Sequence, residues 1–497
     1  MRLSRAMAAG ALPLLWFASC TPLDSENDSF TAGAAGSADA QAGKSSGGSA
    51  GTSNDAGAGS SNGAGQSPSA GAGGDGSAAE GGSAGSDGGC PEPGERDVEP
   101  LAQAAELTLT ADTTWSCEHD YRIHNNIIVA PGVTLSIAAG TTLSFDADTL
   151  LLVQRGGRIQ AEGSAAAPIT LTSAKPPGTR APGDYRGLIL AGNGPSQSST
   201  VPVHDSLSDA RAHYGGGQAG DPESSCGVLR YVRIEFAGGS IDDPTLPAGA
   251  LTLAGCGAKT VVDYVQVQRA TDGIGLLGGT APLRHVVVSN NLLGEAIEWS
   301  AGYTGTMQFV VAQSLGASAA LQGSNSADDP EASPVSRPTI YNATLIGSAP
   351  LVTGQHFGVL LQFGSRLVLK NSIVQGFADA GFDLRLDASV LKSQVGATKP
   401  IDISHALLYG NAKAYSDAAS VLSTMESMRT QNPGLTSAAN PSAQMPNALP
   451  IFAPSDPTVN TQPAAVPSGF DSTAGFRGGV AQDGQDWTQG WTSYPAD

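Results

Sequence analysis

One six-residue pattern recurs seven times within residues 229–408 and limits what this chain can fold into. The pattern runs apolar, polar, aromatic or amide, small or apolar, any residue, apolar. Its copies begin 21 to 34 residues apart: LRYVRI (229–234), VDYVQV (262–267), LRHVVV (283–288), MQFVVA (307–312), IYNATL (340–345), LKNSIV (369–374) and ISHALL (403–408). Such intervals, each with room for two or three short strands, are typical of stacked coils that bury one apolar row against the next. The repeat therefore predicts an all-β chain folded as a right-handed parallel β-helix. The alternative, a β-sandwich, does not explain a recurring hexapeptide.

Longer stretches of the same region resemble bacterial secreted or lipid-anchored right-handed parallel β-helix proteins. The resemblance extends from about Leu107 to Tyr494 and rests on GDYRGLILAGN (183–193), CGVLRYVRIEFAGG (226–239), ALTLAGCGAKTVVDYVQVQRATDGIGLLGGT (250–280), RPTIYNATLIG (337–347) and DWTQGWTSY (486–494). It implies a coil architecture and little chemistry, because no activity or catalytic residue is established for these proteins as a group.

The N-terminus has the layout of a secretory signal. Arg2 and Arg5 precede an apolar stretch from about residue 7 to 17, and Cys20 follows two small residues. This arrangement is too short for a stable membrane span. It resembles the lipobox of bacterial lipoproteins, although Phe17 stands where an aliphatic residue is usual. We expect residues 1–19 to be a signal peptide and Cys20 to be acylated. The protein would then be exported and anchored by lipid at the outer membrane or cell surface.

Residues 24–89 consist almost entirely of Ser, Gly, Ala, Asn and Asp. So few large apolar side chains cannot offset the entropy of ordering, so we expect residues 20–89 to be a disordered tether. Residues 90–497 would form the β-helix domain with its terminal caps. The whole chain has 25 basic and 45 acidic residues, a balance that argues against nucleic acid as a partner. We expect a monomer.

Four cysteines remain if Cys20 carries lipid. In an oxidising compartment they predict two disulfides, for which three connectivities are possible. We expect the pairs nearest in sequence, Cys90–Cys117 and Cys226–Cys256. No spacing of Cys and His is typical of a zinc site.

The segment DGIGLLGG (272–279) contains a literal G-x-G-x-x-G at Gly273, Gly275 and Gly278. A dinucleotide site needs these glycines to open a helix whose N-terminus meets the pyrophosphate. Here another coil strand follows, with no room for a crossover helix. We therefore expect the glycines to form tight corners between coils and not to bind a nucleotide.

Asp272, Glu295 and Glu298 form the one candidate carboxylate cluster for a ligand or a metal. Related chains carry an acidic pair before the glycine, of which this chain keeps only Asp272. Calcium takes about six to eight oxygen ligands, so three carboxylates would bind it only with help from waters and carbonyls. No cofactor is expected beyond such an ion, and a solvated acidic face is the simpler interpretation. Trp299 and Tyr303 are candidates for stacking on a sugar.

Other aromatic and imidazole side chains have structural interpretations. His285 and His405 occupy the same repeat position as Tyr231 and Tyr264, so we expect them to belong to a ladder. Trp487, Trp491 and Tyr494 are expected to cap the last coil, because an open end exposes unpaired backbone. Only residues 417–429 are compatible with a short helix.

These features predict a surface lipoprotein with a non-catalytic binding or structural role at the cell envelope, toward a glycan or another surface protein. The alternative is a polysaccharide lyase or glycoside hydrolase acting in a β-helix groove. A hydrolase needs a carboxylate pair, for which Glu235, Asp263, Asp272 and Glu298 are candidates. A lyase would use a basic row such as Arg230, Arg233, Arg269 and Arg284. The same arginines can instead pair with carboxylates on neighbouring strands.

Overall fold

A computed structural model describes residues 90–91, 95–200, 210–238, 249–291, 294–316, 318–348, 355–386, 393–435, 452–482 and 486–495. The chain divides into two compact units, Met1–Ala84 and Gly85–Asp497. The first unit lies outside the described residues, and so do the predicted signal peptide, the acylated Cys20 and the tether.

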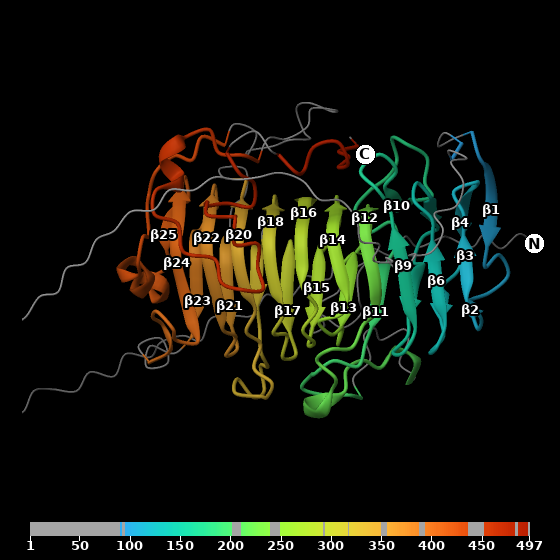
Figure 1. The fold of residues 1–497 in the computed structure, drawn as a ribbon, viewed down its shortest axis with the longest axis horizontal. Helices are drawn as coiled ribbons and strands as arrows, with labels where there is room; N and C mark the ends of the chain where they lie inside the picture. Colours follow the sequence, from blue (N-terminus) through green and yellow to red (C-terminus); the bar gives the residue numbers. More distant parts are fainter. Residues whose placement is uncertain are drawn as a thin grey trace, which may run out of the picture. The chain divides into compact units, whose positions relative to one another are not determined.

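Parallel strands in two sheets make up the second unit (Figure 1). The 14-stranded sheet contains β1 (Asp97–Leu101), β3 (Thr113–Trp115), β4 (His119–Ile123), β6 (Thr134–Ile137), β7 (Thr142–Phe145), β9 (Arg158–Glu162), β10 (Ile169–Ser173), β12 (Gly227–Glu235), β14 (Val261–Gln268), β16 (Leu283–Asn291), β18 (Thr306–Ser314), β20 (Thr339–Ile346), β22 (Leu367–Gln375) and β24 (Ile401–Tyr409).

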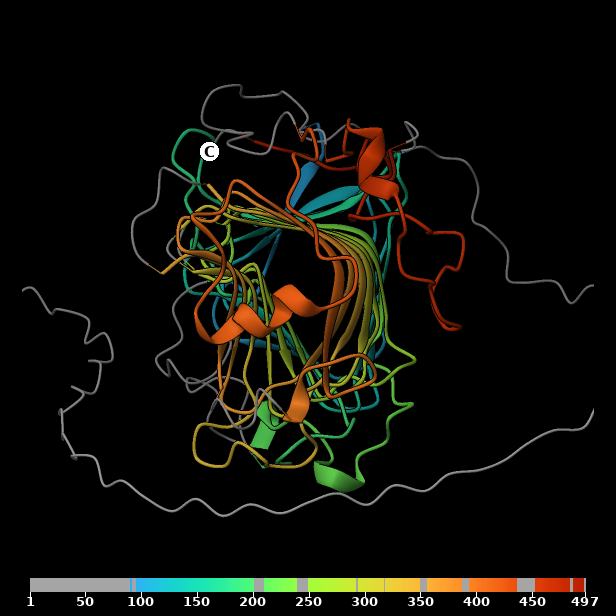
Figure 2. The same ribbon diagram turned by 90° about the vertical axis from the view of Figure 1, so that its left-hand side faces the viewer.

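The 11-stranded sheet supplies one strand to each coil. Its strands are β2 (Leu107–Leu109), β5 (Ile127–Val129), β8 (Leu150–Val153), β11 (Gly187–Ala191), β13 (Leu251–Ala254), β15 (Ile274–Leu277), β17 (Ile297–Ser300), β19 (Ala319–Gly323), β21 (Phe357–Gln362), β23 (Ala380–Arg385) and β25 (Lys413–Tyr415). Viewed along the stack, strands of successive coils superpose around a single core (Figure 2). The predicted right-handed parallel β-helix is confirmed.

The described residues include short 3-10 helices outside the two sheets: η2 (Ala210–Ala212), η3 (Gly217–Ala219), η4 (Ala418–Thr424) and η5 (Pro457–Asn460). The short helix expected within residues 417–429 is η4, and it is shorter than that range. Ala419 and Leu422 of η4 are buried in the core at the last coil. This helix therefore covers the end of the stack.

Each long strand of the 14-stranded sheet bends at one residue. The first half of β12 pairs with β9 and its second half pairs with β10, so the sheet forms two faces that meet at the bend. The bend is residue three of the repeat, and its φ angle is positive in every copy: Tyr231 49°, Tyr264 57°, His285 47°, Phe309 60°, Asn342 55°, Asn371 57° and His405 54°. The predicted ladder, including His285 and His405, is confirmed.

Ring stacking stabilises this left-handed backbone at Tyr231, Tyr264, His285 and Phe309. The centroid of the His285 ring lies 4.3 Å from that of Tyr264 and 4.8 Å from that of Phe309. Left-handed conformation costs about 1–2 kcal/mol for a residue with a Cβ, and a stacked aromatic pair contributes about 0.5–1.5 kcal/mol. Stacking between coils therefore offsets much of the backbone strain.

Both predicted disulfides are present. Cys90 pairs with Cys117, and Cys226 pairs with Cys256. The first ties the start of the described domain to the first coils. The second joins the residue before β12 to the residues after β13, across two successive coils. These pairs confirm the choice made among the three possible connectivities.

Two of the three faces of the stack are covered by the chain itself. On the 11-stranded sheet, the outward side chains of Leu152 and Ile189 pack under Ala212 and Tyr214 of the loop before β12. On the second half of the 14-stranded sheet, an apolar row packs under the C-terminal strap, defined here as residues 452–482 and 486–495. That row is Val287, Val311, Ile346, Ile373 and Leu407.

Side-chain amides fasten the strap to the sheet. Gln266 on β14 donates to the carbonyl of Ser493 at 2.8 Å and accepts from its N–H at 2.9 Å. Gln308 on β18 binds Asp471 through the same two groups, and Asn371 on β22 binds Ala464 in the same way. Each amide thus replaces the peptide group of a neighbouring strand, which satisfies the backbone of the strap.

The strap is also fixed by a buried arginine. The guanidinium of Arg477, whose side chain is fully buried, donates to the carbonyls of His405, Val459, Thr461 and Gln462 and to the hydroxyl of Ser427. Burial lowers the pKa of Arg477 to about 10, and the nearby Arg429 adds to this, so the group is still charged at neutral pH. Charge-assisted bonds of this kind are stronger than neutral ones.

We predict that Arg477→Met lowers the free energy of unfolding by about 3 kcal/mol or more, because several buried oxygens lose their donor. Chemical denaturation followed by circular dichroism measures the change. Arg122→Met is the matched control, since Arg122 is half exposed and its side chain binds only the Asp146 carboxylate. An equal loss of stability in the two variants would contradict the role given to Arg477.

Candidate functional site

The predicted carboxylates come together on the 11-stranded sheet. Asp272 lies two residues before β15, Glu295 lies two residues before β17, and Glu298 lies within β17. The parallel register pairs Ile274 with Ile297, which places Asp272 and Glu295 at the same position of adjacent coils. The N–H of Gly273 donates to the carbonyl of Glu295 at 2.9 Å and fixes this register.

Glycines make room for the carboxylates. Gly275 stands opposite Glu298 in the register of β15 and β17, so no side chain covers Glu298 from that side. Gly294 lies against the Asp272 carboxylate, and a Cβ at Gly294 would overlap one carboxylate oxygen. The glycines of the G-x-G-x-x-G therefore serve coil geometry. Gly278 has a positive φ of 60° at the corner after β15, Gly275 lies inside the strand, and strand β16 follows.

The cluster favours protonated acids. Burial, and after it the Glu295 charge, raise the pKa of Asp272 to about 7, against a hydrogen bond from the Glu295 backbone. Burial also holds the pKa of Glu298 well above its usual range, with smaller contributions from Glu295 and Asp272. A carboxyl group that stays protonated near neutral pH can donate a proton or a hydrogen bond.

Neither a metal centre nor a stacking platform accompanies these acids. Within the described ranges, no three His, Cys, Asp or Glu side chains converge in a way that could hold a metal ion. Trp299 is 1% exposed and donates to the Ser365 hydroxyl, and Tyr303 is 1% exposed and donates to the carbonyl of Ala281. Both rings lie in the core, and that of Trp299 points inward because residues 297 and 299 alternate inward with the pleat of β17. This corrects the expectation that they stack on a ligand.

The four arginines of the predicted basic row lie on different faces. Arg230 and Arg284 point outward from the first halves of β12 and β16. Arg233 points outward from the second half of β12, where it donates to the carbonyl of Trp491 at 2.5 Å under the strap. Arg269 lies at a left-handed turn after β14, with φ of 49°. These four arginines therefore do not form a single row.

The open flank is the surface made by Arg158, Glu162, Arg230, Asp263 and Arg284 on β9, β12, β14 and β16. Glu162, Arg230, Asp263 and Arg284 stand next to one another on successive strands, so the charge alternates in sign. Arg230 lies 3.0 Å from the Glu162 carboxylate and 4.0 Å from that of Asp263. Arg230 thus lies beside carboxylates on both neighbouring strands, as the alternative interpretation of the arginines has it, and the flank is of mixed charge.

The aromatic residues near the C-terminus are not at the end of the stack. The Trp491 ring lies edge-on to Tyr231 and Tyr264, at 5.8 and 5.9 Å, and Trp487 lies edge-on to His285 at 5.1 Å. These contacts are on β12, β14 and β16, in the middle of the stack of coils. The prediction that Trp487, Trp491 and Tyr494 cap the last coil is therefore wrong, because η4 covers that end.

Comparison with known proteins gives one match. A family described as a pectate-lyase-like beta helix domain matches residues 107–492. No curated protein and no solved structure matches the chain. Among the described residues, no helix is long and apolar enough to span a membrane.

The raised pKa of Asp272 predicts a pH-dependent stability. Folding favours the protonated acid between its ordinary pKa of 3.8 and about 7, so this contribution to stability is present at low pH and is lost as pH rises through that window. Asp272→Asn cannot ionise. We expect it to have a higher melting temperature than the wild type at pH 8 and the same one at pH 4, measured by calorimetry.

Asp184→Asn is the control, because its expected effect on the melting temperature at pH 8 has the opposite sign. Burial opposes ionisation of Asp184, but hydrogen bonds from Lys175, Ser173 and the Ala181 backbone outweigh it and lower its pKa. This group stabilises the fold above its unfolded pKa, so the variant should be less stable than the wild type at pH 8. A melting temperature of Asp272→Asn below that of the wild type at pH 8 would show that Asp272 is ionised and paired.

Proposed function

The chain belongs to the family of pectate-lyase-like β-helix domains, and from this premise we propose that it is a lipid-anchored surface protein that binds a glycan without cleaving it. Membership of a pectate-lyase-like family supports a role that involves polysaccharides, and the two disulfides suit an extracellular protein. Lipid on Cys20 would hold the β-helix at the cell surface through residues 20–89.

The alternating charge of the open flank is the observation that carries this proposal. The loop before β12 and the C-terminal strap cover much of the other two faces, as described above. On the flank, Arg230 lies between two carboxylates, so it has no uncompensated charge with which to neutralise an acidic sugar. A flat surface of mixed charge offers many donors and acceptors to a linear polymer and no enclosed position for a reacting bond.

A hydrolase is the second candidate, favoured by the protonated acids at Glu298 and Asp272. Hydrolysis requires one protonated and one ionised carboxyl at opposite sides of the scissile bond. Glu298 would be the acid and Glu295 the second carboxyl of the pair. The two candidates use different surfaces, because the carboxylates lie on the 11-stranded sheet and the flank lies on the 14-stranded one.

The test is a glycan array probed with the full-length chain, followed by product analysis on every glycan that binds. We expect binding without shorter products, and at least a fivefold loss of affinity in Arg284→Glu, which breaks the charge alternation. Arg122→Glu, a charge reversal away from the flank, should bind as the wild type does. Release of shorter chains by the wild type but not by Glu298→Gln would establish the hydrolase instead.

The anchor has its own test. Cells that express the wild type are labelled with a palmitate analogue beside cells that express Cys20→Ser. We expect the label to appear only on the wild type and to fractionate with membranes. Equal labelling of the two proteins would remove the lipid from the proposal and leave the binding role untouched.

A further inference from the structure

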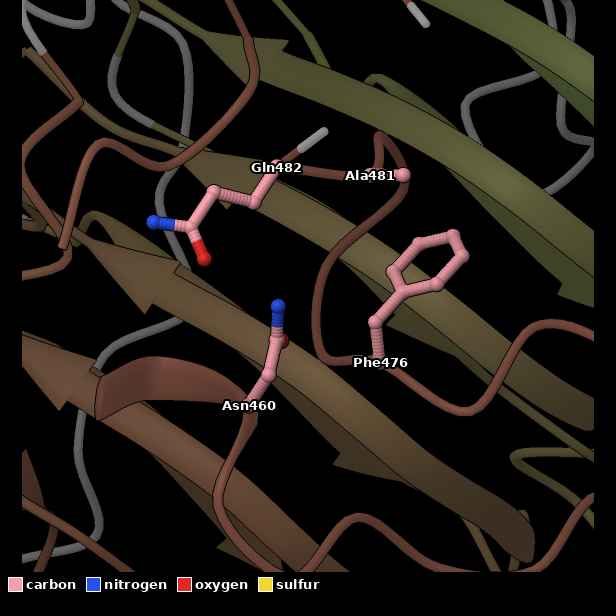
Figure 3. A pocket seen from close by; sticks show the side chains of 4 residues that line it. All are labelled: Asn460, Phe476, Ala481 and Gln482. Carbon is pink, nitrogen blue, oxygen red and sulfur yellow. The ribbon is translucent and has the colours of Figure 1, made fainter. Parts of the chain in front are cut away.

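A cavity of about 330 Å³ lies in the C-terminal strap, away from the open flank and from the carboxylate cluster. Its walls are Asn460, Phe476, Ala481 and Gln482 (Figure 3). Figure 3 shows the two amide groups facing one another across the opening, with the Phe476 ring on the other side. The volume is at the lower end of the range for small-ligand sites, about 300–1,000 Å³.

Buried contacts hold the first wall, Asn460, in place. The Asn460 side-chain oxygen accepts from the backbone N–H of Arg477 at 2.9 Å, so this amide is oriented with its nitrogen toward Gln482 across the opening (Figure 3). The Arg477 guanidinium binds the carbonyls of Val459 and Thr461, the two neighbours of Asn460, each at 2.7 Å. The loop that carries Asn460 is therefore fixed before any ligand arrives.

The second wall, Phe476, is fixed by the same arginine and by the ladder. Phe476 directly precedes Arg477, and its carbonyl accepts from the Asn342 amide at 2.6 Å. The centroid of its ring lies 6.2 Å from that of Phe309, with 23° between the planes. Preorganised walls reduce the entropy lost on binding, so a small site can still give measurable affinity.

The chemistry of the walls selects one class of ligand. An aromatic ring packs against the apolar C–H face of a sugar, and planar amides exchange hydrogen bonds with its hydroxyls. None of the four lining side chains is charged. We propose that this cavity is a binding site for one or two units of an uncharged oligosaccharide. The proposal deepens the glycan-binding function and rests on it: it adds a contact on the strap to the one on the flank.

The experiment uses the full-length chain and three neutral probes: hexasaccharides of glucose, of mannose and of N-acetylglucosamine. Saturation-transfer NMR detects weak binding, and calorimetry measures the affinity. We expect at least one probe to bind, with at least a fivefold loss in Phe476→Ala and in Asn460→Asp. Asn460→Asp retains the oxygen that accepts from Arg477 and removes the donor that faces the cavity.

Two controls separate this proposal from the general function. Gln218→Glu makes the amide-to-acid change outside the cavity and should bind as the wild type does, and Arg284→Glu reverses a charge of the flank that does not line the cavity. Melting temperatures of all variants, with Phe476→Leu as the milder replacement, show which of them are folded.

Binding lost only in Arg284→Glu would overturn the cavity and leave the glycan-binding function in place. Failure of all three neutral probes, with an acidic hexasaccharide still bound, would do the same. Failure of every oligosaccharide would overturn both proposals.

Discussion

The left-handed bend in each long strand is the constraint on which the rest of the structure depends. In each long strand a single residue with positive φ bends the strand between two faces. The equivalent residue of the next coil must bend at the same position along its strand, or the parallel register could not continue past the bend. Tyr231, Tyr264, His285 and Phe309 meet this demand by stacking on one another, whereas Asn342 and Asn371 bind the strap with their amides. The bend thus determines both the cross-section of the stack and the place where the strap lies.

Each face then has a different surface chemistry. The face under the strap is apolar and closed, because an uncovered strip of valine, isoleucine and leucine would be an interaction surface of its own. The carboxylates collect at the start of neighbouring strands on the 11-stranded sheet, where glycines leave space for them. The flank remains open and carries charges of alternating sign. Binding to the flank or to the cavity in the strap therefore requires no opening of the core.

The coils and the carboxylate cluster could be predicted from the sequence, because both depend on spacing along the chain. The hexapeptide repeats at the bend, and Asp272 and Glu295 occupy equal positions in successive coils. Trp299 was misplaced because an aromatic residue near two acids looked exposed, whereas the pleat of β17 turns it inward beside Ile297. The strap contacts carry no local signal. Asn371 and Ala464 are 93 residues apart, and Gln266 and Ser493 are 227 residues apart.

Because the strap follows all the coils in the chain, it has a bearing on the order of folding. Coils can stack as they leave the ribosome or the export channel, since each contacts only its neighbours. The apolar row from Val287 to Leu407 nevertheless has no cover until residues 452–495 arrive. A chain that ends early exposes this strip, and exposed strips of that kind promote aggregation or degradation. The strap therefore has to dock after the coils have formed, and only a molecule with its strap in place presents a closed surface over this row.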